Sequence, residues 1–208
     1  MPNYSLVIFD FGTLADSFPW FLASLDRTAE QFGLNRVNPD EIEALRLRSS
    51  RDVLQHLGVP MLKLPAIAIY MRNIFAESMS DIRMFDGAAD MLRSLHDGGV
   101  KLALVSSNAE ANVRHVLGDA ADLIDHYACG SSLWGKAQKF GAVLRALRQS
   151  PARTLAVGDE IRDIDAARQA GLSAGSITFG YNARPALEGH APDFLFDDYA
   201  ALTRAVLA

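Results

Sequence analysis

Cysteine, positive charge and long apolar runs are all scarce in this sequence, and each shortage argues against a class of protein. Cys129 is the single cysteine of 208 residues, so no internal disulfide can form. A catalytic thiol would need a nearby base, which the sequence around Cys129 does not offer, so we interpret it as a small buried residue. Lysine and arginine number 20 against 25 acidic residues, a net charge of -5, which makes nucleic acid a poor partner.

No stretch of the sequence approaches the roughly 18 uninterrupted apolar residues of a membrane-spanning helix. The N-terminal run Leu6–Phe9 is also too short for the core of a signal peptide. We therefore expect a cytoplasmic protein with no membrane partner. Half of the residues are apolar, which is enough to build a sizeable core.

Four short runs rich in valine, isoleucine and leucine each precede a Gly, Ser or Asp turn and then a helical pattern. The runs are apolar throughout, which is typical of parallel strands covered by helices on both faces. The sequence therefore predicts an α/β fold with a doubly wound, Rossmann-like parallel sheet. The expected strands are 5–9, 101–105, 154–157 and 173–178, and the expected covering helices are 86–98, 109–117, 136–148 and 163–170.

A long insertion with helical periodicity and no strand-like run separates the first strand from the second. Asn38-Pro39-Asp40 begins one of its helices, and Gly58-Val59-Pro60 ends another. We expect a helical cap domain at 15–82 and a catalytic core made of 1–14 and 83–208. The cap helices are expected at 18–33, 39–48, 50–57 and 64–80.

Asp10 ends the first expected strand, where a carboxylate would point into the crevice at the carboxyl edge of the sheet. A carboxylate there could attack phosphorus and form an acyl phosphate, which divides one difficult displacement into two easier ones. Gly12 and Thr13 follow and could contact the substrate. Alternatively, Asp10 is a polar strand end, followed by a turn in which the Thr13 hydroxyl caps the local backbone.

The second expected strand ends in Ser106-Ser107-Asn108, where the Ser106 hydroxyl and backbone N–H groups could hold a phosphoryl oxygen. The same triplet could instead be an ordinary helix N-cap. Lys136 opens the next helix at its crevice end and could neutralise a transferring phosphoryl group. Lys139, one turn later, is the rival for this role.

Gly158-Asp159 ends the third of these strands, and Asp163 lies one helical turn further on. Asp159 could ligate a cation in the crevice, and Asp163 could support that ligand or Lys136. Hard oxygen ligands of this kind suit Mg²⁺. The alternative for Asp163 and Asp165 is an acidic helix N-terminus stabilised by the helix dipole.

These segments, in this order, resemble the haloacid dehalogenase superfamily, and in particular its phosphoglycolate phosphatase-like members with a helical cap after the first motif. The matching segments are 7–17, 85–87, 105–108 and 158–167. The resemblance implies a magnesium-dependent phosphatase with an aspartyl-phosphate intermediate on Asp10. It implies Mg²⁺ held by Asp10, Asp159 and a backbone carbonyl near Phe11 and Gly12, with Ser106 and Lys136 binding the phosphoryl group.

The complete expected site has three parts. Its catalytic residues are Asp10, Ser106 and Lys136, and its metal ligands are Asp10, Asp159 and Asp163. Its substrate-binding residues are Gly12, Thr13, Ser106, Ser107, Asn108 and Lys136. The expected partner is a small phosphorylated metabolite, with the protein acting as a monomer or homodimer.

The first motif departs from the family pattern Asp-x-Asp-Gly-Thr, because this chain reads Asp10-Phe11-Gly12-Thr13. The second aspartate is the family's general acid and base. Three explanations compete: the cellular protein carries one residue more, for example a modified aspartate; the residue is deleted; or the protein binds phosphate or metal without turnover. We favour the first, because the other motifs are intact. A phosphomutase or a dehalogenase is the enzymatic alternative to a phosphatase.

Three arginines of the cap, Arg46, Arg48 and Arg51, could reach an anionic substrate when the cap closes. A solvated arginine face is the alternative. In either case the cap is where we expect substrate choice to reside, because it would close over the crevice and exclude water.

The intact mass of the purified protein distinguishes the explanations for the first motif. A mass heavier than the sequence by one aspartyl residue, or by a modified one, is the expected result. A mass that matches the sequence would rule out an additional residue.

Overall fold

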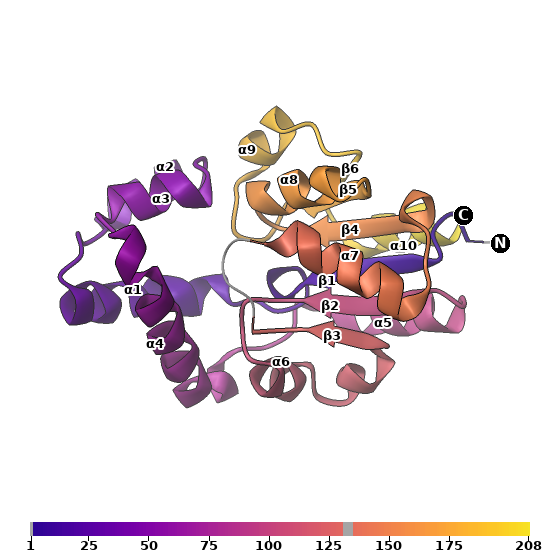
Figure 1. Ribbon diagram of the computed structural model, residues 1–208, viewed down its shortest axis with the longest axis horizontal. Helices are drawn as coiled ribbons and strands as arrows, with labels where there is room; N and C mark the ends of the chain where they lie inside the picture. The colour runs from indigo at the N-terminus through magenta and orange to yellow at the C-terminus, as the bar shows by residue number, and fades with distance from the viewer. Residues whose placement is uncertain (1, 131–134) are drawn as a thin grey trace.

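The computed structural model describes residues 2–130 and 135–208, and a six-stranded parallel sheet forms its centre (Figure 1). The strand order is β3-β2-β1-β4-β5-β6, and every neighbouring pair is parallel. The strand order reverses direction at β1, and such sheets bind ligands beyond the strand ends at this point. The strands are β1 (Leu6–Asp10), β2 (Lys101–Val105), β3 (His126–Ala128), β4 (Thr154–Gly158), β5 (Ser173–Ile177) and β6 (Phe194–Phe196).

Helices cover both faces of the sheet, which confirms the doubly wound arrangement expected from the apolar strands. Val7 and Phe9 of β1 belong to the core on one face, and Leu6 and Ile8 belong to the core on the other. Alternate residues of one strand are therefore buried against different helices. The first face packs against α5 (Ala88–Asp97), α6 (Glu110–Leu117) and α10 (Tyr199–Leu207), and the second against α7 (Lys136–Leu147), α8 (Ile161–Gln169) and α9 (Arg184–Gly189).

The segment between β1 and α5 forms a helical cap beside the strand ends, as the sequence predicts. Figure 1 shows these helices at one end of the molecule and both termini at the opposite end. Pro19 in the first turn of the first cap helix and Gly33 after its last residue set its limits. The cap helices are α1 (Phe18–Phe32), α2 (Ile42–Leu45), α3 (Ser50–His56) and α4 (Leu64–Glu77).

Two connecting segments join the cap to the sheet and lie side by side. Ala15 and Met84 form an isolated antiparallel bridge. The backbone N–H of Asp16 donates to the carbonyl of Arg83, and that of Phe85 donates to the carbonyl of Leu14. Both crossings of the chain between cap and core therefore occur at one place.

Several elements differ from the sequence prediction. The expected helix 39–48 is divided into a 3-10 turn, Pro39–Glu41, and the short α2, and α4 ends at Glu77 before a second 3-10 turn. The edge strands β3 and β6 and the helices α9 and α10 were not predicted. Each edge strand has only three residues, which is too short for a periodic pattern to identify.

None of the described helices is by itself long and apolar enough to cross a membrane. Length and composition suffice only when Ser50–His56 and Met61–Glu77 are taken together, across a bend of 107°.

Candidate functional site

Lys136 connects two carboxylates at the carboxyl edge of the sheet. Its Nζ donates to Oδ1 of Asp10 over 2.6 Å and also to Oδ1 of Asp163. Asp10 ends β1, Lys136 is the first residue of α7, and Asp163 lies in the first turn of α8. Three elements distant in sequence therefore meet at one ammonium group, whose side chain is 12% exposed.

The electrostatic surroundings keep Asp10 ionised. Burial opposes its ionisation, but the charges of Lys136 and Arg162 and hydrogen bonds from Lys136 and the Gly12 N–H hold the pKa of Asp10 below its usual range. Burial alone would lower the pKa of Lys136, but the negative charges of Asp10 and Asp163 outweigh it and raise this pKa above its usual value. At neutral pH the pair is a carboxylate beside an ammonium group.

Asp163 fixes the start of α8 in addition to binding Lys136. Its Oδ2 accepts hydrogen bonds from the backbone N–H groups of Asp159 and Glu160, each over 3.1 Å. A Cβ at Gly158 would lie 2.1 Å from the Cβ of Asp163, so only glycine allows this approach. Asp163 therefore takes both roles expected for it: it supports Lys136, and it caps an acidic helix N-terminus.

Asp159 lies in a closely fitted space between two glycines. A Cβ at Gly12 would lie 2.7 Å from its carboxylate oxygens, and a Cβ at Gly180 would lie 2.3 Å from its Cβ. The Tyr181 N–H donates to its Oδ2 over 3.0 Å. Its Oδ1 is buried and has no hydrogen-bond partner within the described residues.

Asp10, Asp159 and Asp163 offer carboxylate oxygens that all lie within 4.8 Å of one another. Three carboxylates and the ammonium of Lys136 leave two negative charges when every group is ionised. Burial, followed by the charges of Asp10, Glu160 and Asp163, raises the pKa of Asp159 well above its usual range. Crowded oxygen donors, one of them without a partner, fit a hard divalent cation.

The segment after β2 lies beside this cluster in the wall of a shared cavity, together with Asp10, Gly12 and Asp159. Ser106 is 4% exposed, and its Oγ accepts a hydrogen bond from the Asn108 N–H over 3.0 Å. Asn108 in turn accepts one from the Ala109 N–H over 2.8 Å. The side chains of Ser106 and Asn108 thus support their own turn at the edge of the cavity.

Thr13 and Lys139 lie away from the carboxylate cluster. Thr13 is fully buried, and its hydroxyl donates to the Asp10 carbonyl over 2.5 Å, so it closes the local turn as the alternative interpretation had it. The Nζ of Lys139 donates to the carbonyls of Ala128 and Cys129. Of the two rival lysines, Lys136 is the one that contacts Asp10.

The three cap arginines do not act together. Arg48 and Arg51 are exposed, as expected of a solvated face. The guanidinium of Arg46 donates to the backbone carbonyls of Gly180 and Tyr181, each over 3.0 Å. Arg46 therefore binds the cap to the core.

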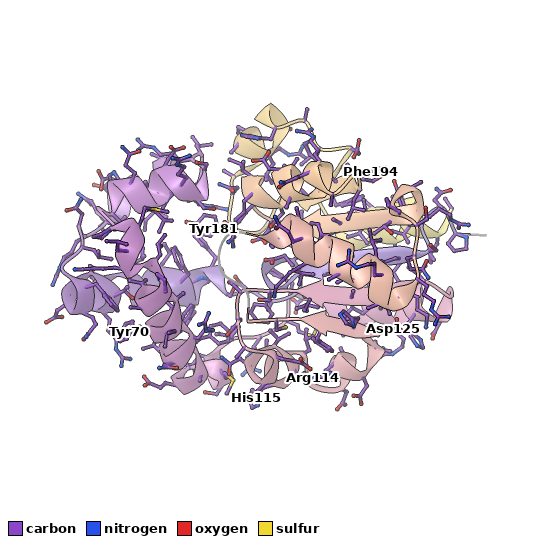
Figure 2. The ribbon with its side chains drawn as sticks, viewed as in Figure 1. Tyr70, Arg114, His115, Asp125, Tyr181 and Phe194 are labelled. Carbon is purple, nitrogen blue, oxygen red and sulfur yellow. The ribbon has the colours of Figure 1, made fainter. Side chains whose placement is uncertain are left out.

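Sequence reasoning gave no role to the segment 180–182, which connects cap, core and Asp159. Asn182 is fully buried; its Oδ1 accepts from the Ile161 N–H, and its Nδ2 donates to the carbonyls of Arg46 and Arg48. Its backbone N–H donates to the Asp159 carbonyl. Figure 2 labels Tyr181 in this segment, between the cap and the core. Gly-Tyr-Asn also occurs in ordinary turns, so only the fold reveals this connection.

Glu160 and Arg162 form a second charged pair in the cavity wall that sequence reasoning also missed. Arg162 forms an ion pair with Glu160, and Glu160 accepts a hydrogen bond from the Ser50 hydroxyl of the cap over 2.7 Å. Burial opposes the charge of Arg162, but Glu160, Asp163 and Asp10 raise its pKa. Arg162 therefore places a positive charge near Asp10, and Glu160 connects the cap to the start of α8.

Comparison with known proteins identifies the family. A protein family described as haloacid dehalogenase-like hydrolase matches residues 7–177, which are most of the chain. This protein belongs to the haloacid dehalogenase-like hydrolases. Among its relatives is the phosphoglycolate phosphatase of Synechococcus elongatus, which is 30% identical over 203 residues that cover 96% of each chain.

Solved structures confirm the fold of this haloacid dehalogenase-like hydrolase. A haloacid dehalogenase-like family protein from Streptococcus pneumoniae has a TM-score of 0.79 at 18% identity, covering 97% of this chain and 98% of that one. CbbY from Rhodobacter sphaeroides, in complex with phosphate, has a TM-score of 0.74 at 22% identity, covering 96% of each. The predicted combination of Rossmann-like core and helical cap is therefore confirmed, and the chain is an enzyme of a hydrolase family.

Lys136→Met in this hydrolase should lower activity by about 10²–10³-fold, because the positive charge beside Asp10, the candidate nucleophile, is lost. It should also lower the free energy of unfolding by about 3–5 kcal/mol, since two buried carboxylates lose their counter-ion. Lys139→Met is the matched control; it loses hydrogen bonds to two carbonyls and should cost about 1 kcal/mol with activity retained. Kinetic assays and urea unfolding measure both effects. Equal loss of activity in the two variants would contradict the choice of Lys136 over Lys139 as the lysine of the site.

Asp159→Asn should stabilise the metal-free protein at alkaline pH. The raised pKa of Asp159 means that its contribution to folding is present at low pH. That contribution is lost as pH rises from the unfolded value of about 3.9 through the folded pKa. Asparagine has no such dependence, so in EDTA the variant should unfold with a free energy larger by the order of a few kcal/mol at pH 8 and nearly unchanged at pH 4.

The matched control for this measurement is Asp165→Asn, an exposed carboxylate in the following helix α8, which should change stability by less than about 0.5 kcal/mol. Lower stability of Asp159→Asn than wild type in EDTA at pH 8 would show that Asp159 is not electrostatically unfavourable in the folded state.

Proposed function

We propose that this protein is a magnesium-dependent phosphatase that hydrolyses a small phosphomonoester through an aspartyl-phosphate on Asp10. As an enzyme it is a phosphoric monoester hydrolase. The observation that carries the proposal is the joint position of Asp10, Lys136, Asp159 and Asp163 at the point where the strand order reverses. Its relative from Synechococcus elongatus, named a phosphoglycolate phosphatase, supports the reaction type.

Asp10 is suited to attack phosphorus because it is ionised and held at the end of a central strand. In the first step a carboxylate oxygen forms a bond to phosphorus, the ester P–O bond breaks, and the alcohol leaves with a proton. In the second step water attacks phosphorus and releases inorganic phosphate, which restores the Asp10 carboxylate. Lys136 would balance the charge on the transferring group, and Ser106 with the backbone of Ser107 would hold its oxygens.

Asp10 and Asp159 are the proposed ligands for Mg²⁺, together with a backbone carbonyl near Phe11 and Gly12; Asp163 would support them. When bound, Mg²⁺ supplies charge that reduces repulsion between the carboxylates and the phosphoryl group. The residues fit this cation, because the buried Oδ1 of Asp159 has no partner among the described residues. A hard, oxygen-preferring ion suits such a donor set.

The first motif sets an expectation for the rate. Gly12 directly follows Phe11 and packs against Asp159, so this sequence places no second carboxylate in the turn. General acid–base assistance contributes about 10²–10⁴-fold to rate. A chain with this exact sequence should therefore be slower by that factor than an enzyme with the complete motif, with water supplying the leaving-group proton.

Hydrolysis of an aryl phosphate and a panel of small phosphate esters tests the proposal. Activity should require Mg²⁺, should disappear in EDTA and should return when Mg²⁺ is restored. Asp10→Asn should abolish it, because the amide is a poor nucleophile. Asp16→Asn, the same exchange at a nearby exposed residue, is the control and should retain activity. No turnover from folded wild-type protein, with phosphate still bound, would refute a phosphatase and leave a phosphate-binding protein.

A further inference from the structure

A cavity of about 300 Å³ extends from the carboxylate cluster into the cap. Its floor includes Asp10, Gly12, Ser106 and Asp159, and its upper walls come from α1, α3 and α4. About ten water molecules in liquid water occupy the same volume. The cavity therefore has room for a group well beyond the phosphoryl group itself.

The upper walls of this cavity are almost entirely apolar. The few polar cap residues among them already have partners: the Thr28 hydroxyl donates to the Ser24 carbonyl over 2.8 Å, and the Asn35 amide donates to the His56 carbonyl over 2.8 Å. The apolar lining of the three helices includes Phe21, Leu25, Val53, Ile67, Ala68 and Met71.

Charged lining residues are confined to the lower end of the cavity. Four of them belong to the core: Asp10, Asp159, Glu160 and Arg162. The charged cap residue among the lining is Arg72, and its guanidinium donates to the Ser107 carbonyl over 3.4 Å, beside the proposed phosphoryl site. An anionic group in the upper cavity would lose its water without gaining a partner, which is strongly unfavourable.

The cap helices enclose this space instead of filling it. The separate apolar cluster within the cap contains three buried residues, Leu45, Val53 and Leu57, and two of these also line the cavity. Inward-facing apolar residues normally pack against one another to native density. Here many of them face a space open to the reacting group, which is typical of a ligand pocket.

We infer that the substrate is the phosphate ester of an apolar alcohol, an aliphatic chain or aromatic ring of several carbons, whose apolar part occupies the cap cavity. This inference rests on the proposed function, because the phosphoryl group must lie at Asp10. It distinguishes this chain from an enzyme for a two-carbon acid, whose second anion could reach only the lower end of the cavity, near Arg72.

A series of n-alkyl phosphates from methyl to hexyl, with phosphoglycolate beside it, tests the inference in the presence of Mg²⁺. Each methylene group that enters the cavity should raise kcat/KM by roughly fourfold until the space is full. Hexyl phosphate should therefore exceed both methyl phosphate and phosphoglycolate by more than about 100-fold. A flat series, or a preference for phosphoglycolate, would overturn the inference and leave the phosphatase intact.

Two alanines of α4 provide a matched pair of variants. Ala68 lines the cavity, whereas Ala66 is exposed on the same helix and does not line it. Ala68→Phe should lower the ratio of kcat/KM for hexyl phosphate to that for methyl phosphate by at least about tenfold. Ala66→Phe should leave the dependence of kcat/KM on chain length as it is in the wild type. The same chain-length dependence in both variants would contradict the placement of the alkyl group beside Ala68.

Binding of alkylphosphonates, which cannot be hydrolysed at the P–C bond, separates this inference from the proposed reaction. Calorimetry should show hexylphosphonate binding more tightly than methylphosphonate by a similar factor per methylene group, with the gain lost in Ala68→Phe. A chain-length dependence in binding without turnover of any ester would refute the phosphatase and support the apolar site. No dependence in binding would refute the apolar site whatever the turnover.

Discussion

The buried ammonium group of Lys136 holds together the ends of three elements that are far apart in the sequence. It binds Asp10 at the end of β1 and Asp163 in the first turn of α8. Asp163 in turn accepts the backbone N–H groups of Asp159 and Glu160. The positions of the proposed nucleophile Asp10, of the second proposed metal ligand Asp159 and of the start of α8 therefore depend on one cation.

That cation does not balance the negative charge around it. Burial and neighbouring carboxylates leave Asp159 with a raised pKa and an oxygen without a partner in the described part of the chain. The Tyr181 N–H donates to this carboxylate, and the space beside it at Gly12 and Gly180 leaves no room for a side chain. A site built in this way is electrostatically incomplete, and a divalent cation is the simplest group that would complete it.

The sequence was sufficient to predict the sheet, its central strands and most of the site. Apolar runs followed by polar residues identified Asp10, Ser106 and Asp159, because parallel strands bring their ends to one edge. Lys136 could not be separated from Lys139, because both lie near the same end of one helix and only the position of that helix against the sheet decides which one reaches Asp10. The roles of Arg46 and Asn182 could not be predicted, because they arise from contacts between segments more than 130 residues apart.

The central place of β1 has a consequence for how the chain reaches this state. Leu6 pairs with Lys101 on one side and with Thr154 on the other. Pairing between residues so distant in sequence requires the closure of long loops, which slows folding. Lys136, Asp159 and the neighbouring strand β4 all follow Asp10 in the sequence by more than 120 residues. The candidate site can therefore form only when these distant segments have come together, so a correctly formed site indicates that the core around it has folded.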